Sequence, residues 1–338
     1  MNDFTVLILP GANASSVATT LDVLAAAAAT ASRAGASAPR WRVLCAGGAS
    51  APLSNGMSVK GAALPARVRS EHSVWIVPGL GLTHPKALAQ RFTEPDALRA
   101  IAALRAHARA GGAVAASCSA VFLLQAAGLL AGRKVTTSWW LAPLLHRLAP
   151  GCTVDADRMV IEDGPLVTAG AAMAQTDLML HLVRTRFGVA LADAVARVLL
   201  IDARAAQAPF VVPEMMAMGN ELVARITARV EAGLPHAPCI EELAMEFAMS
   251  ARTLARHVKA ATGRSPLALV QSVRLNKARA LLENSKLSVD EVALRVGYED
   301  ATALRRLMRK ATGATPRQFR ANGREGRPAP LRSSASPA

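Results

Sequence analysis

Cysteine is scarce in this sequence of 338 residues. It has four, Cys45, Cys118, Cys152 and Cys239. Their spacing matches neither a metal site nor a disulfide framework, and it suits a reducing compartment. The first residues lack a basic leader before an apolar run, so no signal peptide is predicted. We therefore expect a cytoplasmic protein with no metal and no cofactor.

Charge is absent from residues 111–132, a run of 22 residues that is long enough to consider a membrane span. Two glycines open this run, however, and Ser117, Ser119 and Gln125 lie within it. These residues argue against a helix in a bilayer. No membrane association is predicted.

Acidic residues are scarce toward the other end of the chain. The formal net charge of the sequence is +15, and residues 238–320 hold 15 basic and 8 acidic side chains. No Asp or Glu occurs in residues 251–282 or 301–317. Such dense positive charge is an electrostatic footprint for phosphate and predicts double-stranded DNA as a partner. A basic surface that binds membranes is the competing interpretation.

The same basic region repeats itself. A shift of 50 positions places residues 254–266 over residues 304–316, with Leu, Arg, Ala-Thr-Gly and Pro in common. Upstream, a shift of 49 places Leu243-Ala244 over Val292-Ala293, so the second copy has one more residue in its turn. Two helices whose connection varies in length are typical of a helix-turn-helix motif. This pattern favours DNA over a membrane.

In each copy the second helix directs basic side chains away from its apolar stripe. The stripe is predicted to contain Leu254 and Val258 in the first copy, and Leu304 and Met308 in the second. A merely solvated helix face would mix in acidic residues. We therefore expect DNA contacts from Arg252, Arg256, Lys259, Thr302, Arg305, Arg306 and Arg309.

A longer helix is predicted between the two copies, from Ser265-Pro266 to about Glu283. At 1.5 Å per residue it would span about 27 Å. The two reading helices could then reach successive segments of the major groove. The inner side of the connecting helix is predicted to carry Leu267, Val270, Val273 and Leu281.

The second copy resembles the C-terminal signature of AraC-type transcription regulators. The sequence departs from that signature at Leu304 and Met308, where the family usually has phenylalanine, and at Thr302, where serine is common. The resemblance implies sequence-specific binding to double-stranded DNA, and contact with RNA polymerase if the protein is an activator. The segments that carry it are Val289-Asp290-Glu291-Val292-Ala293, Val296-Gly297-Tyr298, residues 304–309, Gly313-Ala314-Thr315-Pro316 and Phe319-Arg320.

The first 200 residues alternate between strands and helices. This alternation predicts an α/β doubly wound fold with a mostly parallel sheet. Ligands bind such folds at the carboxyl ends of the strands, so residues 117–120 are candidates for a site. Strands are predicted at residues 4–9, 41–45, 74–77 and 113–116, and helices at 17–31, 95–110 and 119–127.

Cys118 follows the fourth predicted strand and precedes a helix. A nucleophile elbow has this geometry, because the sharp turn exposes the side chain and the helix amides can lower a thiol pKa. A half-buried structural thiol is the alternative. The surroundings resemble flavodoxin-like domains of the PfpI type, in the class I glutamine amidotransferase-like superfamily. The matching segments are Ser117-Cys118-Ser119-Ala120, residues 127–132, Thr136-Thr137-Ser138-Trp139 and Thr168-Ala169-Gly170.

Catalytic members of that superfamily pair the cysteine with a histidine and a carboxylate. Ser16, Ser119 and Ser138 stand at the positions where relatives have those groups. Without a base, the thiol has no proton acceptor, so we expect a binding cavity and no enzyme. The candidate ligand-binding residues are Asp22, Cys118, Ser119, Trp139 and Gly170.

The two tryptophans at 139 and 140 could wall a pocket for a cationic ligand, and we expect one of them to be a core or interface residue. The two resemblances together indicate a GlxA-type regulator, which implies a small nitrogen-containing effector such as an amino acid or a betaine. The predicted divisions are a sensor domain at 1–204, a linker at 205–219, a DNA-binding domain at 220–322 and a disordered tail at 323–338.

Three functions remain open at this point. The first is a ligand-responsive regulator that forms a homodimer through its sheet domain. The second is a thiol-dependent amidase or hydrolase fused to a DNA-binding module, which requires a histidine beside Cys118. The third is an architectural DNA-binding protein without a ligand, in which the N-terminal cavity is occluded.

Overall fold

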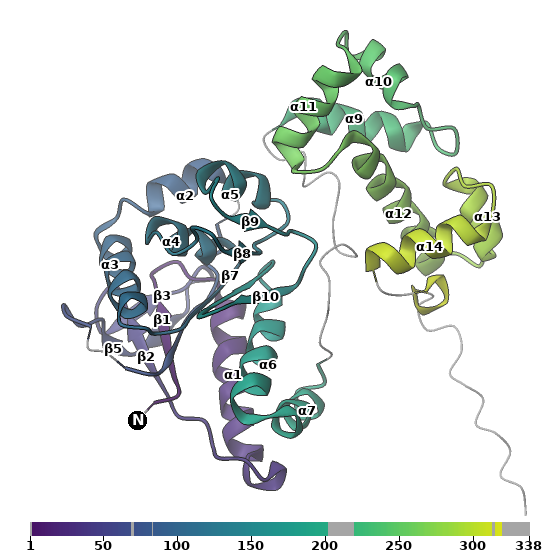
Figure 1. Ribbon diagram of the computed structural model, residues 1–338. Coiled ribbons are helices and arrows are strands. Elements are labelled where there is room, and N and C mark those ends of the chain that lie inside the picture. The colour runs from purple at the N-terminus through teal and green to yellow at the C-terminus, as the bar shows by residue number, and fades with distance from the viewer. Residues whose placement is uncertain (1, 69–70, 83, 202–219, 313–314, 320–338) are drawn as a thin grey trace, which may run out of the picture.

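The computed structural model describes residues 2–68, 71–82, 84–201, 220–312 and 315–319. The predicted linker at 205–219 and tail at 323–338 lie outside these residues. The N-terminal part is an α/β unit and the C-terminal part is helical (Figure 1). In the part of the chain that the structure describes, every helix is too short or too polar to cross a bilayer.

The α/β unit is built on a seven-stranded sheet with the order β10-β11-β7-β6-β1-β2-β5. All neighbouring strands in it are parallel except β10 and β11. Short pairs β3-β4 and β8-β9 lie outside it. The strands are β1 (Phe4–Ile8), β2 (Trp41–Cys45), β3 (Ser50–Pro52), β4 (Ser58–Lys60), β5 (Ala62–Ala63), β6 (Val74–Val77), β7 (Val114–Ser117), β8 (Lys134–Val135), β9 (Thr153–Val154), β10 (Val160–Asp163) and β11 (Leu166–Ala169).

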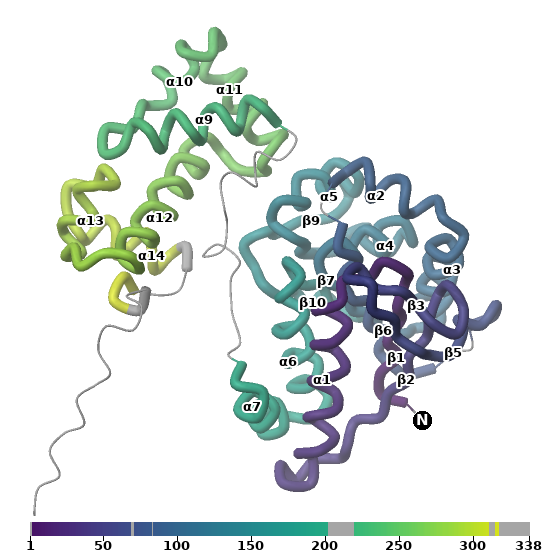
Figure 2. The backbone as a smooth tube through the Cα atoms, turned by 180° about the vertical axis from the view of Figure 1, so that it is seen from behind, coloured from purple at the N-terminus to yellow at the C-terminus, as the bar shows by residue number. Residues whose placement is uncertain are grey.

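Helices cover both faces of the sheet. One hydrophobic core joins α1, α6 and α7 to one face, and α1 and α6 run side by side in both views (Figures 1 and 2). A second core joins α2, α3, α4 and α5 to the other face. The helices are α1 (Ala14–Thr30), α2 (Pro85–Arg91), α3 (Pro95–Arg109), α4 (Val121–Ala126), α5 (Ala142–Leu148), α6 (Ala174–Phe187) and α7 (Val189–Val198), with 3-10 turns η1 (Ser32–Ala34) and η2 (Cys118–Ala120).

The central strands β1, β6 and β7 are buried along their whole length. Strands covered on both faces contain continuous apolar runs and not alternating ones, which is why they could be recognised in the sequence. The predicted doubly wound, flavodoxin-like fold is confirmed. The antiparallel hairpin of β10 and β11 was not predicted.

The helical part has two hydrophobic cores that share α12. The first core contains Val223, Leu243, Leu254 and Leu269, and the second contains Leu282, Val292, Leu304 and Met308. The all-α domain with two helix-turn-helix motifs is therefore confirmed. The helices are α9 (Glu221–Ala232), α10 (Ile240–Glu246), α11 (Ala251–Thr262), α12 (Pro266–Asn284), α13 (Val289–Arg295) and α14 (Ala301–Thr312), followed by η4 (Pro316–Phe319).

Caps in the helical part agree with the sequence. The Ser250 and Ser265 hydroxyls accept hydrogen bonds from the backbones of Thr253 and Ala268 at 3.1 and 3.2 Å. Such side-chain caps satisfy backbone N–H groups that have no partner inside the helix. The predicted inward position of Leu267 is wrong, because its side chain is 58% exposed on the first turn of α12.

Candidate ligand site and nucleic-acid interface

Cys118 forms a strained elbow at the carboxyl end of β7. Its φ angle is +55°, a left-handed conformation that costs a residue with a side chain about 1–2 kcal/mol. Two hydrogen bonds hold it there. The Cys118 N–H donates to the Gly170 carbonyl at 2.7 Å, and the Thr137 hydroxyl donates to the Cys118 carbonyl at 2.7 Å. The elbow predicted from the sequence is thus present.

The thiol at this elbow is buried and faces a hydroxyl group. Cys118 is 3% exposed, and the Ser138 hydroxyl donates to its sulfur at 2.9 Å. Burial raises the pKa of the Cys118 thiol above its ordinary value, and hydrogen bonds from Ser138 and Ser119 offset only part of this rise. The thiol is therefore neutral near pH 7. A neutral thiol is a poor nucleophile.

The other two serines that replace catalytic groups are also engaged. The Ser119 hydroxyl accepts a hydrogen bond from the Leu80 backbone at 3.1 Å, and the Ser16 hydroxyl donates to the Ala172 carbonyl at 3.2 Å. The first bond joins η2 to the loop after β6, and the second joins the start of α1 to the segment before α6.

The hydrolase hypothesis requires a histidine beside Cys118, but three histidines of the α/β unit, His72, His84 and His146, lie in other surroundings. His84 caps α2 by accepting a hydrogen bond from the Lys86 backbone at 3.2 Å. His146 is exposed on α5, whereas Cys118 is buried. His72 lies before the amino end of β6, whereas Cys118 lies at the carboxyl end of its parallel neighbour β7, so the two residues are at opposite ends of the strands. Among the described residues, no group of three or more His, Cys, Asp or Glu side chains could hold a metal ion.

The structure brings together some of the predicted ligand-binding residues and separates others. Cys118, Ser119 and Gly170 meet at the elbow. Asp22 is exposed on α1, six residues or about 9 Å beyond Ser16. Trp139 is 3% exposed and packs with the first core of the helical part.

Sequence reasoning missed a buried polar pair below Ser16. The Gln175 side-chain amide on α6 donates to the Thr20 hydroxyl on α1 at 2.8 Å, and both residues are fully buried. Ser16 and Thr20 are one turn apart on α1, so two hydroxyls at i and i+4 on an apolar helix were the available signal.

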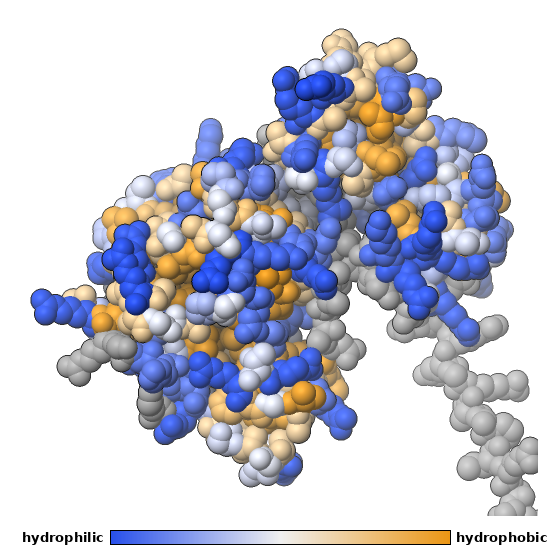
Figure 3. Space-filling view, in the orientation of Figure 1, coloured by the Kyte–Doolittle hydropathy of each residue, from blue (hydrophilic) through white to orange (hydrophobic). Residues whose placement is uncertain are grey.

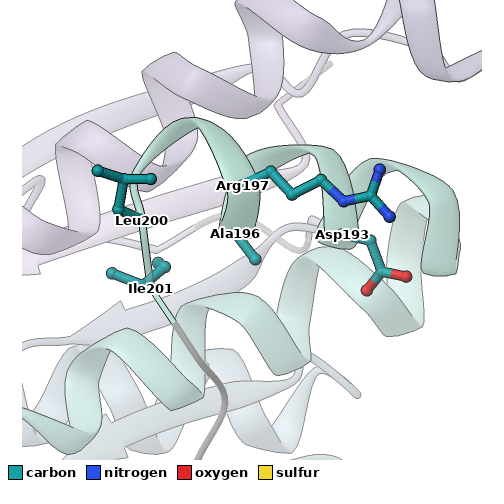
Figure 4. Close-up of a pocket in the computed structure, with 5 residues that line it drawn as sticks. All are labelled: Asp193, Ala196, Arg197, Leu200 and Ile201. Atoms are coloured by element: carbon teal, nitrogen blue, oxygen red, sulfur yellow. The ribbon is translucent and has the colours of Figure 1, made fainter. Parts of the chain in front are cut away.

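A separate cavity of about 440 Å³ lies beside the end of α7, away from Cys118 (Figure 4). Its lining consists of Asp193, Ala196, Arg197, Leu200 and Ile201. None of the predicted site residues belongs to this lining. The cavity is therefore not the site that the elbow indicates.

The seven predicted DNA contacts are all exposed on α11 and α14. On the opposite sides of these helices, Leu254 and Leu304 are fully buried. Hydrophilic side chains cover the visible surface at α14 (Figure 3). In the described part of the chain, Arg256 and Arg306 form no ion pair, whereas Arg229 is paired with Glu246 at 2.8 Å. The charges of the two reading faces are thus available to a partner.

Known proteins share both parts of this architecture. Residues 3–185 match the DJ-1/PfpI family, and residues 243–322 match a helix-turn-helix domain. The transcriptional regulator CdhR of Pseudomonas aeruginosa is 28% identical over 327 residues, which cover 94% of this chain and 91% of CdhR. The transcriptional regulator GlxA of Rhizobium meliloti is 27% identical over 280 residues, which cover 82% of this chain and 83% of GlxA.

A solved structure of a ThiJ/PfpI family protein from Pseudomonas syringae aligns with a TM-score of 0.47 and 17% identity, covering 80% of this chain and 91% of that chain. The family match spans more than half of the sequence and coincides with the α/β unit that carries the Cys118 elbow. The chain belongs to the DJ-1/PfpI family and joins a domain of that family to an AraC-type helix-turn-helix domain, as in the GlxA-type transcriptional regulators.

Proposed function

We propose that this transcriptional regulator binds a small effector at the Cys118 elbow and that it is not an enzyme. The observation that carries the proposal is the surroundings of the thiol. Cys118 is buried, its pKa is raised by that burial, and its sulfur accepts a hydrogen bond from Ser138. A nucleophilic cysteine needs a base or a lowered pKa, and this site provides neither among the described residues.

The proposed effector is a small nitrogen-containing metabolite. The hydroxyls of Ser119 and Ser138 and the carbonyl of Gly170 lie at the elbow, and all are uncharged. Hydroxyl groups donate and accept, and carbonyls accept from N–H groups, so this set fits a polar ligand with N–H donors. We place Cys118, Ser119 and Gly170 among the contacts. Asp22 is exposed and lies outside them.

For DNA, we propose that each chain reads two adjacent sub-sites. The helix α12 has 19 residues and so a length of about 28 Å. Major-groove segments on one face of a duplex repeat about every 34 Å. The proposed base and phosphate contacts are Arg252, Arg256, Lys259, Thr302, Arg305, Arg306 and Arg309. A homodimer through the sheet domain would place two such readers on one operator, and an activator would also contact RNA polymerase.

The strained backbone at Cys118 also fits a second function, that of a thiol-dependent amidase or hydrolase. Catalytic members of the superfamily use this same geometry, and Cys118 retains it with φ at +55°. The two functions differ in what the sulfur does. As a sensor, the protein needs the shape of the cavity. As a hydrolase, it needs the thiol.

Thermal-shift screening of amino acids and methylated amines, followed by footprinting on DNA with each hit, tests the proposal. At a concentration of 100 times Kd, a ligand stabilises the folded chain by about 2.7 kcal/mol. We expect Cys118→Ala to retain operator binding and its response to the hit. Loss of the response through this change alone would show that covalent chemistry at Cys118 is required.

A further inference from the structure

A contact between the two parts of the chain is centred on Trp139. This residue follows the Cys118 site in the α/β unit, yet its indole lies in the same hydrophobic cluster as Val223, Ile226 and Leu254 of the helical part. Beside it, α5 packs against α11, the reading helix of the first helix-turn-helix motif. The α/β unit thus holds that motif directly.

Polar contacts flank the buried tryptophan. The Arg264 guanidinium, just before α12, donates to the Asp157 carboxylate at 2.6 Å. The Arg147 guanidinium on α5 donates to the Ala260 carbonyl, near the end of α11, at 3.4 Å. Both contacts lie at the carboxyl end of α11, while Arg252 and Arg256 remain exposed. The contact therefore holds the motif at the carboxyl end of α11 and leaves its reading face exposed.

Trp139 is adjacent in sequence to a residue of the proposed ligand site. Ser138 donates to the Cys118 sulfur at 2.9 Å, and the next residue is Trp139. Residues 137 and 138 are anchored to the elbow and residue 139 to the helical part, so a shift of one anchor displaces the other. No intervening loop is available to absorb the movement.

The contact also contains a buried polar group that lacks a partner. Trp140 packs edge-on against Trp139, with ring centroids 5.1 Å apart. Within the described residues, its indole N–H is buried and has no hydrogen-bond acceptor. Such a group destabilises the arrangement that buries it. The docked arrangement is thereby less stable than a fully satisfied interface, which favours opening.

We propose that this contact transmits the state of the Cys118 elbow to the first helix-turn-helix motif. While Thr137 and Ser138 stay packed at the elbow, with the Thr137 hydroxyl bonded to the backbone carbonyl of residue 118, Trp139 stays docked and fixes the orientation of α11. When a ligand displaces Ser138, Trp139 withdraws and the helical part is released. The inference rests on the effector binding proposed above, and it names the route by which that binding reaches DNA.

Coupling between two sites is reciprocal, so release of the helical part must loosen the packing around Cys118. Alkylation of Cys118 measures that loosening without ligand or DNA. The full chain with Cys239→Ser, which removes the exposed cysteine, is treated with iodoacetamide, and mass spectrometry follows each remaining thiol. Asp157→Arg replaces the ion pair to Arg264 with repulsion, at a residue whose side chain is 68% exposed.

We expect Asp157→Arg to raise the alkylation rate of Cys118 by about fivefold. Loss of one ion pair costs about 1 kcal/mol, which shifts the equilibrium between docked and released states by about that factor. X-ray scattering should show a larger radius of gyration. Adding Arg264→Asp restores an ion pair and should return both values. Trp139→Ala should act in the same direction. The matched control is Asp193→Arg. It breaks the exposed ion pair between Arg184 and Asp193, whose charged atoms are 3.2 Å apart and which lies outside the contact.

Unchanged Cys118 alkylation in Asp157→Arg overturns the proposal, and so does an unchanged radius of gyration. An equal rise at buried Cys45 and Cys152 also overturns it, because it would mean general unfolding. These results are independent of the proposed function. Effector-controlled DNA binding could survive a negative result here, and a positive result here would stand even if every effector screen failed.

Discussion

The turns of the two helix-turn-helix motifs use the same left-handed position with different residues. Ala248 in the first turn has φ of +52°, and Gly297 in the second has φ of +84°. Matching backbone bonds show that they are equivalent, since Met249 N–H donates to Ala244 and Tyr298 N–H donates to Ala293. The first motif accepts a side chain at this point. We predict that the second cannot.

The reason is the carbonyl group of Pro235. A Cβ atom at Gly297 would lie 2.2 Å from the Pro235 oxygen, a backbone atom that cannot move aside cheaply. The left-handed conformation costs alanine about 1–2 kcal/mol, less about 0.4–1 kcal/mol because alanine also restricts the unfolded chain. Overpacking adds about 1–3 kcal/mol. Gly297→Ala should therefore destabilise the second motif by about 3 kcal/mol, the centre of the range of about 1–5 kcal/mol that these contributions give.

Gly263→Ala is the matched control. Gly263 has φ of +71°, but its nearest contact for a Cβ atom is 4.0 Å away, so this change carries the backbone strain alone. Ala248→Gly is the reverse change and should stabilise the first motif.

Hydrogen exchange in the full chain reports each motif separately. We expect Gly297→Ala to accelerate exchange in α13 and α14 by about 30-fold or more, and Gly263→Ala to accelerate α11 and α12 by about fivefold, since each 1.36 kcal/mol is a factor of ten. Equal effects of the two substitutions would refute the clash with Pro235.

Two further predictions concern the reading helices. Arg256→Ala and Arg306→Ala should each weaken binding to a specific operator by about 1–3 kcal/mol if the guanidinium groups reach bases. An equal loss on random duplex, measured by fluorescence anisotropy, would show that they touch phosphate only. At the start of α14, hydrogen bonds from the Ala303 and Thr302 backbones lower the pKa of Asp300. Because the folded state favours the Asp300 carboxylate, this group stabilises the fold at pH values above 3.8, the ordinary pKa of Asp. That stabilisation is lost as the pH falls through the lower pKa of the folded state. Helix α14 should loosen in acid, measured by circular dichroism, and Asp300→Asn should remove this part of the pH dependence because the amide oxygen still caps the helix. An unaltered acid transition in that variant would exclude the cap as its cause.

The sequence predicted those parts of the fold that depend on local chemistry. Strands β2 and β6 have the predicted bounds, because β6 is a continuous apolar run and β2 departs from one only at Arg42. The caps at Ser250 and Ser265 were also local features. The Cys118 elbow followed from a strand that runs into a helix.

Features that depend on contacts between distant segments were not predictable in the same way. The apolar side of α12 changes along its length as it passes from one core to the other, so a single periodic stripe misplaced Leu267. Asp22 was predicted to bind ligand because it is a carboxylate on the first helix. Only the packing of α1 on the sheet shows that Ser16 and Thr20 face inward and that Asp22 faces outward. Trp139 could be assigned to a core or an interface, yet its partner lies more than 80 residues further along the chain.

The same distinction separates charge as a count from charge as a function. The basic residues of the helical part divide into two sets in the structure. Arg229 is paired with Glu246 between α9 and α10, and Arg279 is paired with Glu283 within α12. Arg256 and Arg306 extend from the reading faces without such partners in the described part of the chain. A phosphate that approaches the second set displaces counterions and not carboxylates, so the salt dependence of DNA binding should follow these few side chains and not the net charge of +15. Neutralising Arg279 should therefore leave that dependence unchanged, whereas neutralising Arg306 should reduce its slope by about one unit.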